Sequence, residues 1–329
     1  MSHPAGRQIL QRMAGTADVV VENFKVDGLR RHGLDHEHLR AAHPRLIYCS
    51  ITGFGQDGPY AERAGYDLMV QAACGLMSIT GHADGEPGGG PLKAGVAVID
   101  ILTGMYASNA ILAALHARER TGRGQYIDTA LLDVGMAMLA NQAAGFFASG
   151  KAPTRAGNAH PSLAPYQDFA TRDGHVLLAI GNDGQFARFC MAVGEAQRAR
   201  DERFATNTAR VRHRDELLAW MQPLLRTRTS AQWIALLQDK AVPCGPINTI
   251  AQAFDDPQVH ARGLKVDLPR EAGDGIACIS TVASPLRLSD TPVRYHGAPP
   301  ALGQHTEEVL MEMGMSKTEI AALRADGTV

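Results

Sequence analysis

The chain has 329 residues, of which 45% are hydrophobic and 20% are charged, and its formal net charge is −2. A chain of this length and composition can bury at least one large core. Its 32 basic and 34 acidic residues form no basic stripe, so the sequence predicts a small-molecule partner and no nucleic acid.

Helices and strands alternate along the first 150 residues. In chain order we expect a helix at 6–14, a strand at 18–22, a helix at 34–42, a strand at 45–52, a helix at 66–78, a strand at 95–99, a helix at 101–120, a strand at 125–130 and a helix at 132–149. The runs VVVEN, LIYCSIT and GVAVI are continuously apolar, which suits strands covered by helices on both faces. The pattern predicts an α/β fold with a doubly wound, mostly parallel, Rossmann-like sheet in a large domain over residues 1–150.

The composition changes after residue 150, where Gly, Pro and small residues predict a linker over residues 151–173. A strand at 174–180 and helices at 184–193, 213–225 and 230–240 predict a second, smaller α+β domain over residues 174–265. Residues 266–329, with a closing helix at 307–314, are expected to form an antiparallel ending that returns to the large domain.

The five cysteines are odd in number and form no C-x-x-C pair, so we expect neither a disulfide framework nor a metal site. The longest apolar segment, 101–117, is interrupted by small and polar residues, and nothing resembles a signal peptide. We therefore expect a cytoplasmic protein with no membrane partner.

Two glycine-rich stretches predict loops rather than nucleotide sites. GFGQDG at 53–58 follows a strand, but Pro59 and the polar segment YAERAG separate it from the next helix, which disfavours a nicotinamide or flavin site. GEPGGGP at 85–91 lacks the Lys-Ser/Thr of a P-loop and is expected to be a surface loop.

Asp100 ends the apolar run GVAVI and precedes the expected helix at 101–120. An Asp at this place either caps the helix by accepting hydrogen bonds from its first amides, or stands at the carboxyl end of a strand, where open α/β sheets hold their chemistry. The residues alone leave both roles open.

Nine segments, in this order, resemble the class III CoA-transferases, the formyl-CoA and carnitine-CoA transferase family of the CaiB/BaiF type. They are ADVVVENF, LIYCSITGFGQDGPY, AGYDLMVQA, GLMSITG, GVAVIDILTGMYA, ARERTGRGQYIDTALLD, RAGNAHPSLAPYQ, VPCGPIN and LGQHTEEVL. The resemblance implies an enzyme that moves CoA from an acyl-CoA donor to a small carboxylic acid through an aspartyl-CoA thioester. It also implies that CoA is a substrate rather than a tightly bound cofactor, that residues 1–150 bind it, and that the protein is an intertwined homodimer.

The resemblance assigns the nucleophile to Asp100, in GVAVIDILTGM. An ionised carboxylate can split one difficult exchange into easier covalent steps without a metal, and the amino end of a helix would favour its anion and offer amides to a developing oxyanion. Asp128 and Asp133, in QYIDTALLD, are rivals by chemistry, and the resemblance gives both structural roles.

The resemblance also implies a CoA pocket around that carboxylate. Its matching residues are Asn23, Phe24, Lys25, Arg31, Tyr66 and Asp67. Arg31 would hold a phosphate, although an Arg beside Arg30 is by itself an ordinary solvated residue. Tyr66 and Asp67 would lie beside the thioester, although helix capping is the alternative role of Asp67.

A departure from formyl-CoA transferase falls in the stretch 158–162, which here reads NAHPS in place of a glycine run. A loop with proline is stiffer than oligoglycine, so we expect less lid movement and an acceptor other than oxalate. Asn158 and His160 are expected to form this substrate loop, with His160 meeting the acceptor carboxylate or lying on the surface.

Two other functions remain open. The α-methylacyl-CoA racemases share this family's fold and use a His before the Asp of a G-H-D segment, but the segment here is Gly65-Tyr66-Asp67, which lacks that second base. The other open function is that of a CoA-binding protein without turnover. The resemblance implies about seventy further residues before HPAGRQIL, supplying strands of the sheet. We therefore expect a shortened form that binds CoA weakly alone.

Overall fold

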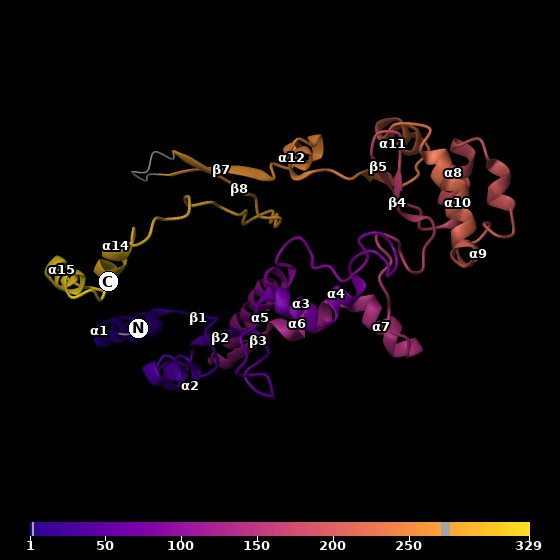
Figure 1. The fold of residues 1–329 in the computed structure, drawn as a ribbon. Helices are drawn as coiled ribbons and strands as arrows, with labels where there is room; N and C mark the ends of the chain where they lie inside the picture. Colours follow the sequence, from indigo (N-terminus) through magenta and orange to yellow (C-terminus); the bar gives the residue numbers. More distant parts are fainter. Residues whose placement is uncertain (2, 271–276) are drawn as a thin grey trace. The chain divides into compact units, whose positions relative to one another are not determined.

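The computed structural model describes residue 1, residues 3–270 and residues 277–329 (Figure 1). Its contacts divide the chain into two compact units, the first made of residues 1–157 with 303–329 and the second of residues 158–302. Part of the ending expected at 266–329, residues 271–276, lies outside the described residues.

The first unit contains a sheet and the helices that cover it. Its strands are β1 (Val19–Glu22), β2 (Ile47–Thr52) and β3 (Tyr126–Ala130). Its helices are α1 (Pro4–Thr16), the 3-10 helix η1 (Arg30–His32), α2 (His36–Ala42), α3 (Asp67–Ala73), α4 (Leu76–Ile79), α5 (Val98–Thr121), α6 (Leu131–Met138), α7 (Ala140–Ser149), α14 (Thr306–Glu312) and α15 (Lys317–Ala325).

The sheet is parallel, in the order β1-β2-β3, with Val20 opposite Tyr48 and Ser50 opposite Asp128. Because side chains alternate along a strand, Tyr48 and Ile51 of β2 face opposite sides. Tyr48 packs in an apolar cluster with Leu39 of α2. Ile51 packs against a second cluster that includes Ile99 of α5. The prediction of a parallel sheet is confirmed for these three strands, and apolar clusters cover both faces of β2.

The strand expected at 95–99 is absent, and this prediction is wrong. Residues 95–97 have no regular structure, and α5 begins at Val98, so Asp100 is the third residue of a helix. A short apolar run suits a buried strand and the buried start of a long helix equally well, and periodicity cannot separate them. Ile99, which is fully buried against Val70 and Leu131, shows that the apolar run serves helix packing.

Two helices expected as single segments are each broken in two. Gly75, at φ 91°, separates α3 from α4. Ala140, at φ 42°, begins α7 after a bend of 70° from α6. Positive φ is outside the range of a right-handed helix, so each of these residues redirects the chain.

Helix α5 is longer and more apolar than expected. By length and composition it is able to cross a membrane, and the bent pair α6 and α7 passes the same test if taken as one segment. The small and polar residues that interrupt 101–117 therefore do not keep α5 from meeting this criterion. One or two such helices are weak evidence for a membrane, because core helices of other proteins pass the same test.

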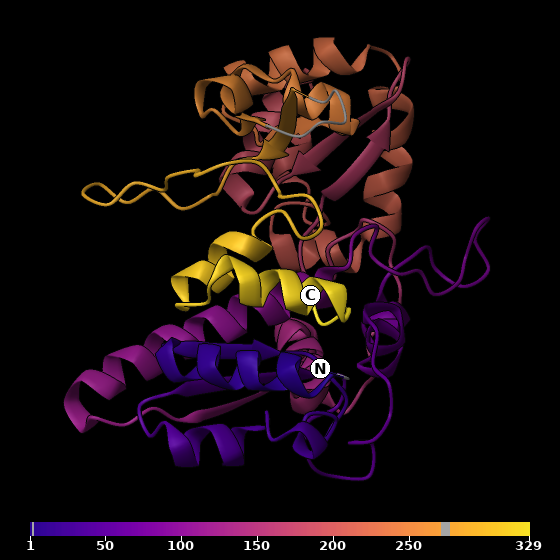
Figure 2. The same ribbon diagram turned by 90° about the vertical axis from the view of Figure 1, so that its left-hand side faces the viewer.

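The chain returns to the first unit through its last two helices, α14 and α15, which lie beside α1 (Figures 1 and 2). Ile9 of α1 packs with Leu310, Ile320 and Leu323. The Arg12 guanidinium donates to the carbonyl of Met313 at 2.6 Å. Segments some three hundred residues apart in sequence thus share one small apolar core.

The second unit has two antiparallel sheets. The first sheet has the order β4-β5-β6, from β4 (Tyr166–Ala170), β5 (His175–Ala179) and β6 (Cys244–Pro246), and the second pairs β7 (Lys265–Pro269) with β8 (Cys278–Val282). The helices are α8 (Asp183–Ala192), the 3-10 helix η2 (Ala196–Arg200), α9 (Asn207–Arg212), α10 (Arg214–Leu225), α11 (Ser230–Asp239), α12 (Ile250–Phe254) and α13 (Pro257–Ala261).

The core of the second unit lies between the β4-β5-β6 sheet and helices α8, α10 and α11. Trp233 of α11 and Phe189 of α8 are buried there with Leu178 of β5. β4 lies within residues 151–173, the stretch that its Gly and Pro content predicted as a linker. The sequence missed β4 because its five residues, YQDFA, show no clean apolar alternation.

Candidate active site

A cleft of about 500 Å³ opens in the first unit where β1 and β2 end and α5 begins. This volume is within the range of small-molecule sites. Its lining residues are Asn23, Phe24, Lys25, Val26, Ile51, Thr52, Gly53, Ala61, Arg63, Ala64, Gly65, Tyr66, Asp100, Thr103, Gly104 and Leu131. Five of the predicted site residues, Asn23, Phe24, Lys25, Tyr66 and Asp100, are therefore brought together.

Asp100 enters the cleft from the first turn of α5, and its side chain is exposed. Among the described residues, no hydrogen-bond donor reaches its carboxylate. Burial, followed by the negative charge of Asp67, raises the pKa of this carboxyl group above its usual value. The site thus holds an accessible carboxylate whose ionised form is neither paired nor hydrogen-bonded.

Asp67, rather than Asp100, satisfies the amino end of α5. Its Oδ1 accepts the backbone N–H of Ile99 at 2.8 Å, whereas the residue at the cap position, Ala97, has no side chain that can accept. The interpretation of Asp100 as a helix cap is wrong. Of the amides that the helix start was expected to offer to an oxyanion, the Ile99 amide is already bonded to Asp67.

The turn after β1 supplies four lining residues, Asn23, Phe24, Lys25 and Val26. Glu22 shapes this turn, because its carboxylate accepts the N–H of Phe24 at 2.7 Å. Tyr66, at the start of α3, is 70% exposed at the cleft. Aromatic and polar groups therefore stand in solvent-accessible positions around the carboxylate.

Gly53 and Gly65 form a close backbone crossing in the wall of the cleft. A Cβ atom on Gly65 would lie 2.3 Å from the Cα atom of Gly53, and the reverse substitution is equally crowded at 2.4 Å. Only glycine fits where two backbones approach so closely. The sequence does not predict this role, because neither GFGQDG nor AGYDLMVQA reveals that the other is its neighbour.

Arg63 is a second residue that the sequence analysis missed. It lines the cleft, and its guanidinium carbon lies 3.7 Å from the centroid of the Tyr60 ring, a cation–π geometry. Within the described part of the chain it has no carboxylate partner. The cleft therefore holds two cations, Lys25 and Arg63, without acidic partners.

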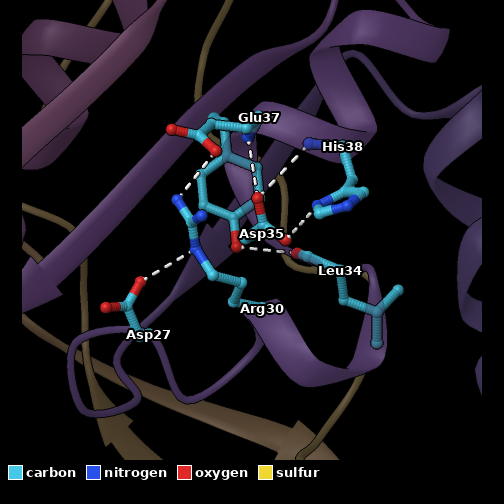
Figure 3. Close-up of polar contacts among 7 residues, drawn as sticks. Asp27, Arg30, Leu34, Asp35, Glu37 and His38 are labelled. Carbon is cyan, nitrogen blue, oxygen red and sulfur yellow. Dashed lines mark hydrogen bonds and ion pairs between the residues drawn. The ribbon is translucent and has the colours of Figure 1, made fainter.

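Arg31 is not among the residues that line the cleft. It lies in η1, where its Nε donates to the His32 ring at 3.2 Å. Its neighbour Arg30 forms ion pairs with Asp27 at 3.1 Å and with Glu37 at 2.7 Å (Figure 3). Of these two arginines, Arg31 is the one without a carboxylate partner among the described residues.

The two rival aspartates occupy β3 and α6. Asp128 accepts the backbone N–H of Gln56 at 3.1 Å and so holds the turn that follows β2. Burial is the largest influence on Asp128, and the net effect raises its pKa. Asp133 lies in the first turn of α6. Neither residue lines the cleft.

Asn158 and His160 belong to the second unit. The Asn158 amide donates to Asp168 at 2.9 Å, and the His160 Nδ1 accepts the backbone N–H of Ser162 at 3.1 Å. The His160 ring also lies 5.3 Å from that of Tyr166. Both side chains have partners within their own unit. Among the described residues, no group of three or more His, Cys, Asp or Glu could hold a metal ion.

Comparison with known proteins gives consistent matches over nearly the whole chain. The model of CoA-transferase family III matches residues 1–306. The chain is 52% identical to a succinate–glutarate CoA-transferase of Agrobacterium fabrum over 315 residues, which cover 94% of this chain and 76% of that protein. It is 38% identical to the succinyl-CoA:glutarate CoA-transferase of Mus musculus over 310 residues, covering 94% and 70%.

A solved structure agrees with these relatives. The crystal structure of a CaiB/BaiF family protein from Brucella suis superposes with a TM-score of 0.82 at 46% identity. The match covers 95% of this chain and 79% of that one.

Proposed function

Because the chain belongs to CoA-transferase family III, we propose that Asp100 carries CoA between two short dicarboxylic acids as an aspartyl thioester. The family's substrates are acyl-CoA thioesters, so CoA passes through the site as part of a substrate. The observation that carries the assignment of Asp100 is its state in the cleft. It is exposed, no donor among the described residues reaches it, and Asp67 rather than Asp100 caps the helix.

The reaction needs only carboxylates and thiolates. A carboxylate oxygen of Asp100 attacks the thioester carbonyl, the C–S bond breaks, and CoA leaves as a thiolate from a mixed anhydride. The thiolate then attacks the Asp100 acyl carbon, so that the donor acid leaves as a carboxylate and CoA remains on Asp100. The acceptor carboxylate repeats these steps in reverse. Each step exchanges one acyl bond for another, and exclusion of water protects the intermediates.

The dicarboxylate assignment is supported by the names of the relatives and by Arg63. Succinate and glutarate appear in the names of the Agrobacterium fabrum and mouse enzymes. A dicarboxylate that reacts at Asp100 has a second, remote carboxylate, which needs a cation when it leaves water. Arg63 lines the same cleft and can meet it with a planar fork of donors. We assign the remote carboxylate to Arg63.

The remaining predicted residues keep their proposed roles. Asn23, Phe24 and Lys25 would bind the CoA part of the donor along the cleft, with Tyr66 and Asp67 beside the thioester. Arg31 would hold a CoA phosphate, which is supported by its lack of a carboxylate partner within the described residues. Asn158 and His160 would meet the acceptor acid.

We also propose that the sheet is doubly wound and Rossmann-like, that the second unit is a smaller α+β domain, and that the enzyme is a homodimer. The apolar residues on α5 support a dimer, because Ile101 is 56% exposed and Leu112 is 63% exposed. Light scattering at micromolar concentration should give twice the mass of the chain. A mass equal to one chain would rule the dimer out.

Trapping the intermediate tests the nucleophile. Incubation with succinyl-CoA and no acceptor should add the mass of CoA, less one water, to the peptide that contains Asp100. Asp100→Ala should gain no mass. A CoA adduct on any other residue would move the nucleophile elsewhere, and rapid exchange of α-protons without transfer would favour the racemase.

A pair of acceptors tests Arg63. In Arg63→Gln, kcat/KM for glutarate should fall by about 10- to 100-fold, as expected for the loss of a charge-assisted hydrogen bond, while valerate, of the same length with one carboxylate, should lose little. Lys25→Gln is the control, because a residue that binds CoA affects both acceptors alike. Equal losses for both acids in Arg63→Gln would exclude recognition of the remote carboxylate.

A further inference from the structure

Gln71 of α3 is a polar side chain that is 0% exposed, and both ends of its amide are used. Nε2 donates to Asp67 Oδ2 at 2.6 Å, and Oε1 accepts the backbone N–H of Ala94 at 2.9 Å. Only this orientation of the amide works, because a carboxylate accepts and a backbone N–H donates. A buried amide with two satisfied ends is expected to be rigid.

These two bonds connect Gln71 to α5 by two routes. Ala94 lies in the segment that leads into α5, four residues before the helix begins. Asp67, held through its Oδ2, accepts the N–H of Ile99 with its other oxygen. Ile99 is the neighbour of Asp100 in the chain. One side chain thereby fixes both the approach to the helix and the group that caps it.

We infer that Gln71 is a positioning residue for the transferase reaction: through Asp67 and Ala94 it holds the first turn of α5, and with it the Asp100 carboxylate, at the cleft. The inference rests on the proposed function, since it gives Gln71 a role in the chemistry assigned to Asp100. Gln71 does not line the cleft and acts through its neighbours.

The same contacts control the electrostatics of Asp100. The cleft around Asp100 also contains Lys25, Arg63 and Tyr66, and Asp133 lies on the adjacent α6. After burial, however, the charge that raises the pKa of Asp100 is that of Asp67. The hydrogen bond from Gln71 fixes where the Asp67 carboxylate lies relative to Asp100. Removing the charge of Asp67, or the hydrogen bond from Gln71 that holds it in place, should therefore change the titration of Asp100.

Three variants separate positioning from stability. Asp67→Asn removes the charge but keeps an oxygen for Ile99. Gln71→Met keeps the length of the side chain but removes both hydrogen bonds. Thr103→Val is the matched control: the buried Thr103 hydroxyl donates to the Ile99 carbonyl at 2.8 Å, so this change perturbs the same turn without touching Asp67.

Asp100 is titrated directly by NMR of ¹³C-carboxyl-labelled aspartate, with Asp100→Asn used to identify its signal. The pKa of Asp100 should fall in Asp67→Asn, fall by less in Gln71→Met, and stay unchanged in Thr103→Val. The acidic limb of the kcat profile should move with it. In Gln71→Met, kcat should fall several-fold while KM for succinyl-CoA is unchanged.

An unchanged pKa of Asp100 in both Asp67→Asn and Gln71→Met, even with reduced activity, would overturn the inference and leave Gln71 a purely structural residue. Asp67→Asn keeps the test valid if Gln71→Met does not fold. Failure of the proposed function looks different: the pKa shifts would occur, but Asp100→Asn would still transfer CoA.

Discussion

Two aspartates at the start of two helices of the first unit are used in opposite ways. Asp35 caps α2: one oxygen accepts the N–H groups of Glu37 and His38, and the other lies 2.6 Å from Nδ1 of His38 (Figure 3). Asp100 stands inside the first turn of α5 with no donor among the described residues, because Asp67 caps that helix from 32 residues away.

The difference in hydrogen bonding appears in the pKa values. Burial alone would raise the pKa of Asp35, but hydrogen bonds from the side chain and backbone of His38 outweigh it, and the net shift is downward. For Asp100, burial and the charge of Asp67 act in the same direction, upward. The hydrogen bonds that Asp35 accepts as a helix cap stabilise its anion. Asp100 accepts no such bonds among the described residues, so its carboxylate stays more basic and is available to attack a thioester.

The sharpest test of this comparison removes the charge of each aspartate. Asp100→Asn should reduce transfer by about 10³-fold or more, because the amide cannot act as the nucleophile. Asp35→Asn keeps an oxygen that can cap α2 and should retain most activity. Steady-state transfer from succinyl-CoA to glutarate measures both, and near-equal activities would remove the distinction between the two residues.

The comparison also assumes a fixed wall beside Asp100, which Gly65→Ala tests. The new Cβ would meet the Cα of Gly53 at 2.3 Å, so the free energy of unfolding should fall by roughly 1–3 kcal/mol, with loss of activity. Gly95→Ala is the control, because its Cβ would meet nothing within 4 Å. Denaturant unfolding measures both. A stable, active Gly65→Ala would show that the two loops can separate.

Removing the side chain of Asp35 should cost stability rather than chemistry. Asp35→Ala loses the cap of α2, worth about 1–2 kcal/mol. Because the folded-state pKa of Asp35 is lowered, its stabilisation is complete above the unfolded-state pKa, about 3.9, and disappears as the pH falls through the folded-state value. The difference in unfolding free energy from wild type should therefore be full at pH 7 and shrink below about pH 4.

The smallest effect has the opposite sign. Because the folded-state pKa of Asp100 is raised, its ionised form destabilises the fold once the pH exceeds the folded-state pKa. Asp100→Asn should thus stabilise the protein at pH 7 by less than about 0.5 kcal/mol, since the carboxylate is exposed and screened. At about pH 3 the gain should vanish. Thermal melts at the two pH values measure it, and destabilisation at pH 7 would contradict the assigned environment.

The sequence by itself determined the parallel sheet, the family and the set of residues worth testing. Continuous apolar runs at β1 and β2 indicate strands covered on both faces, because successive side chains of a strand point to opposite faces and each buried face needs apolar residues. The nine matching segments carry the chemistry of Asp100 with them, and five of the predicted site residues do line one cleft.

Only the tertiary structure decided how that chemistry is held in place. The Ile99 N–H donates to Asp67, the Ala94 N–H donates to Gln71, and the backbones of Gly53 and Gly65 cross. These contacts join residues that are 32, 23 and 12 positions apart. Local patterns contain no information on such pairs, because a hydrogen bond or a steric clash depends on which groups meet in space. For the same reason the apolar run before Asp100, which locally suits a strand, has no regular structure at 95–97 and supplies the first two residues of α5, of which Ile99 is buried.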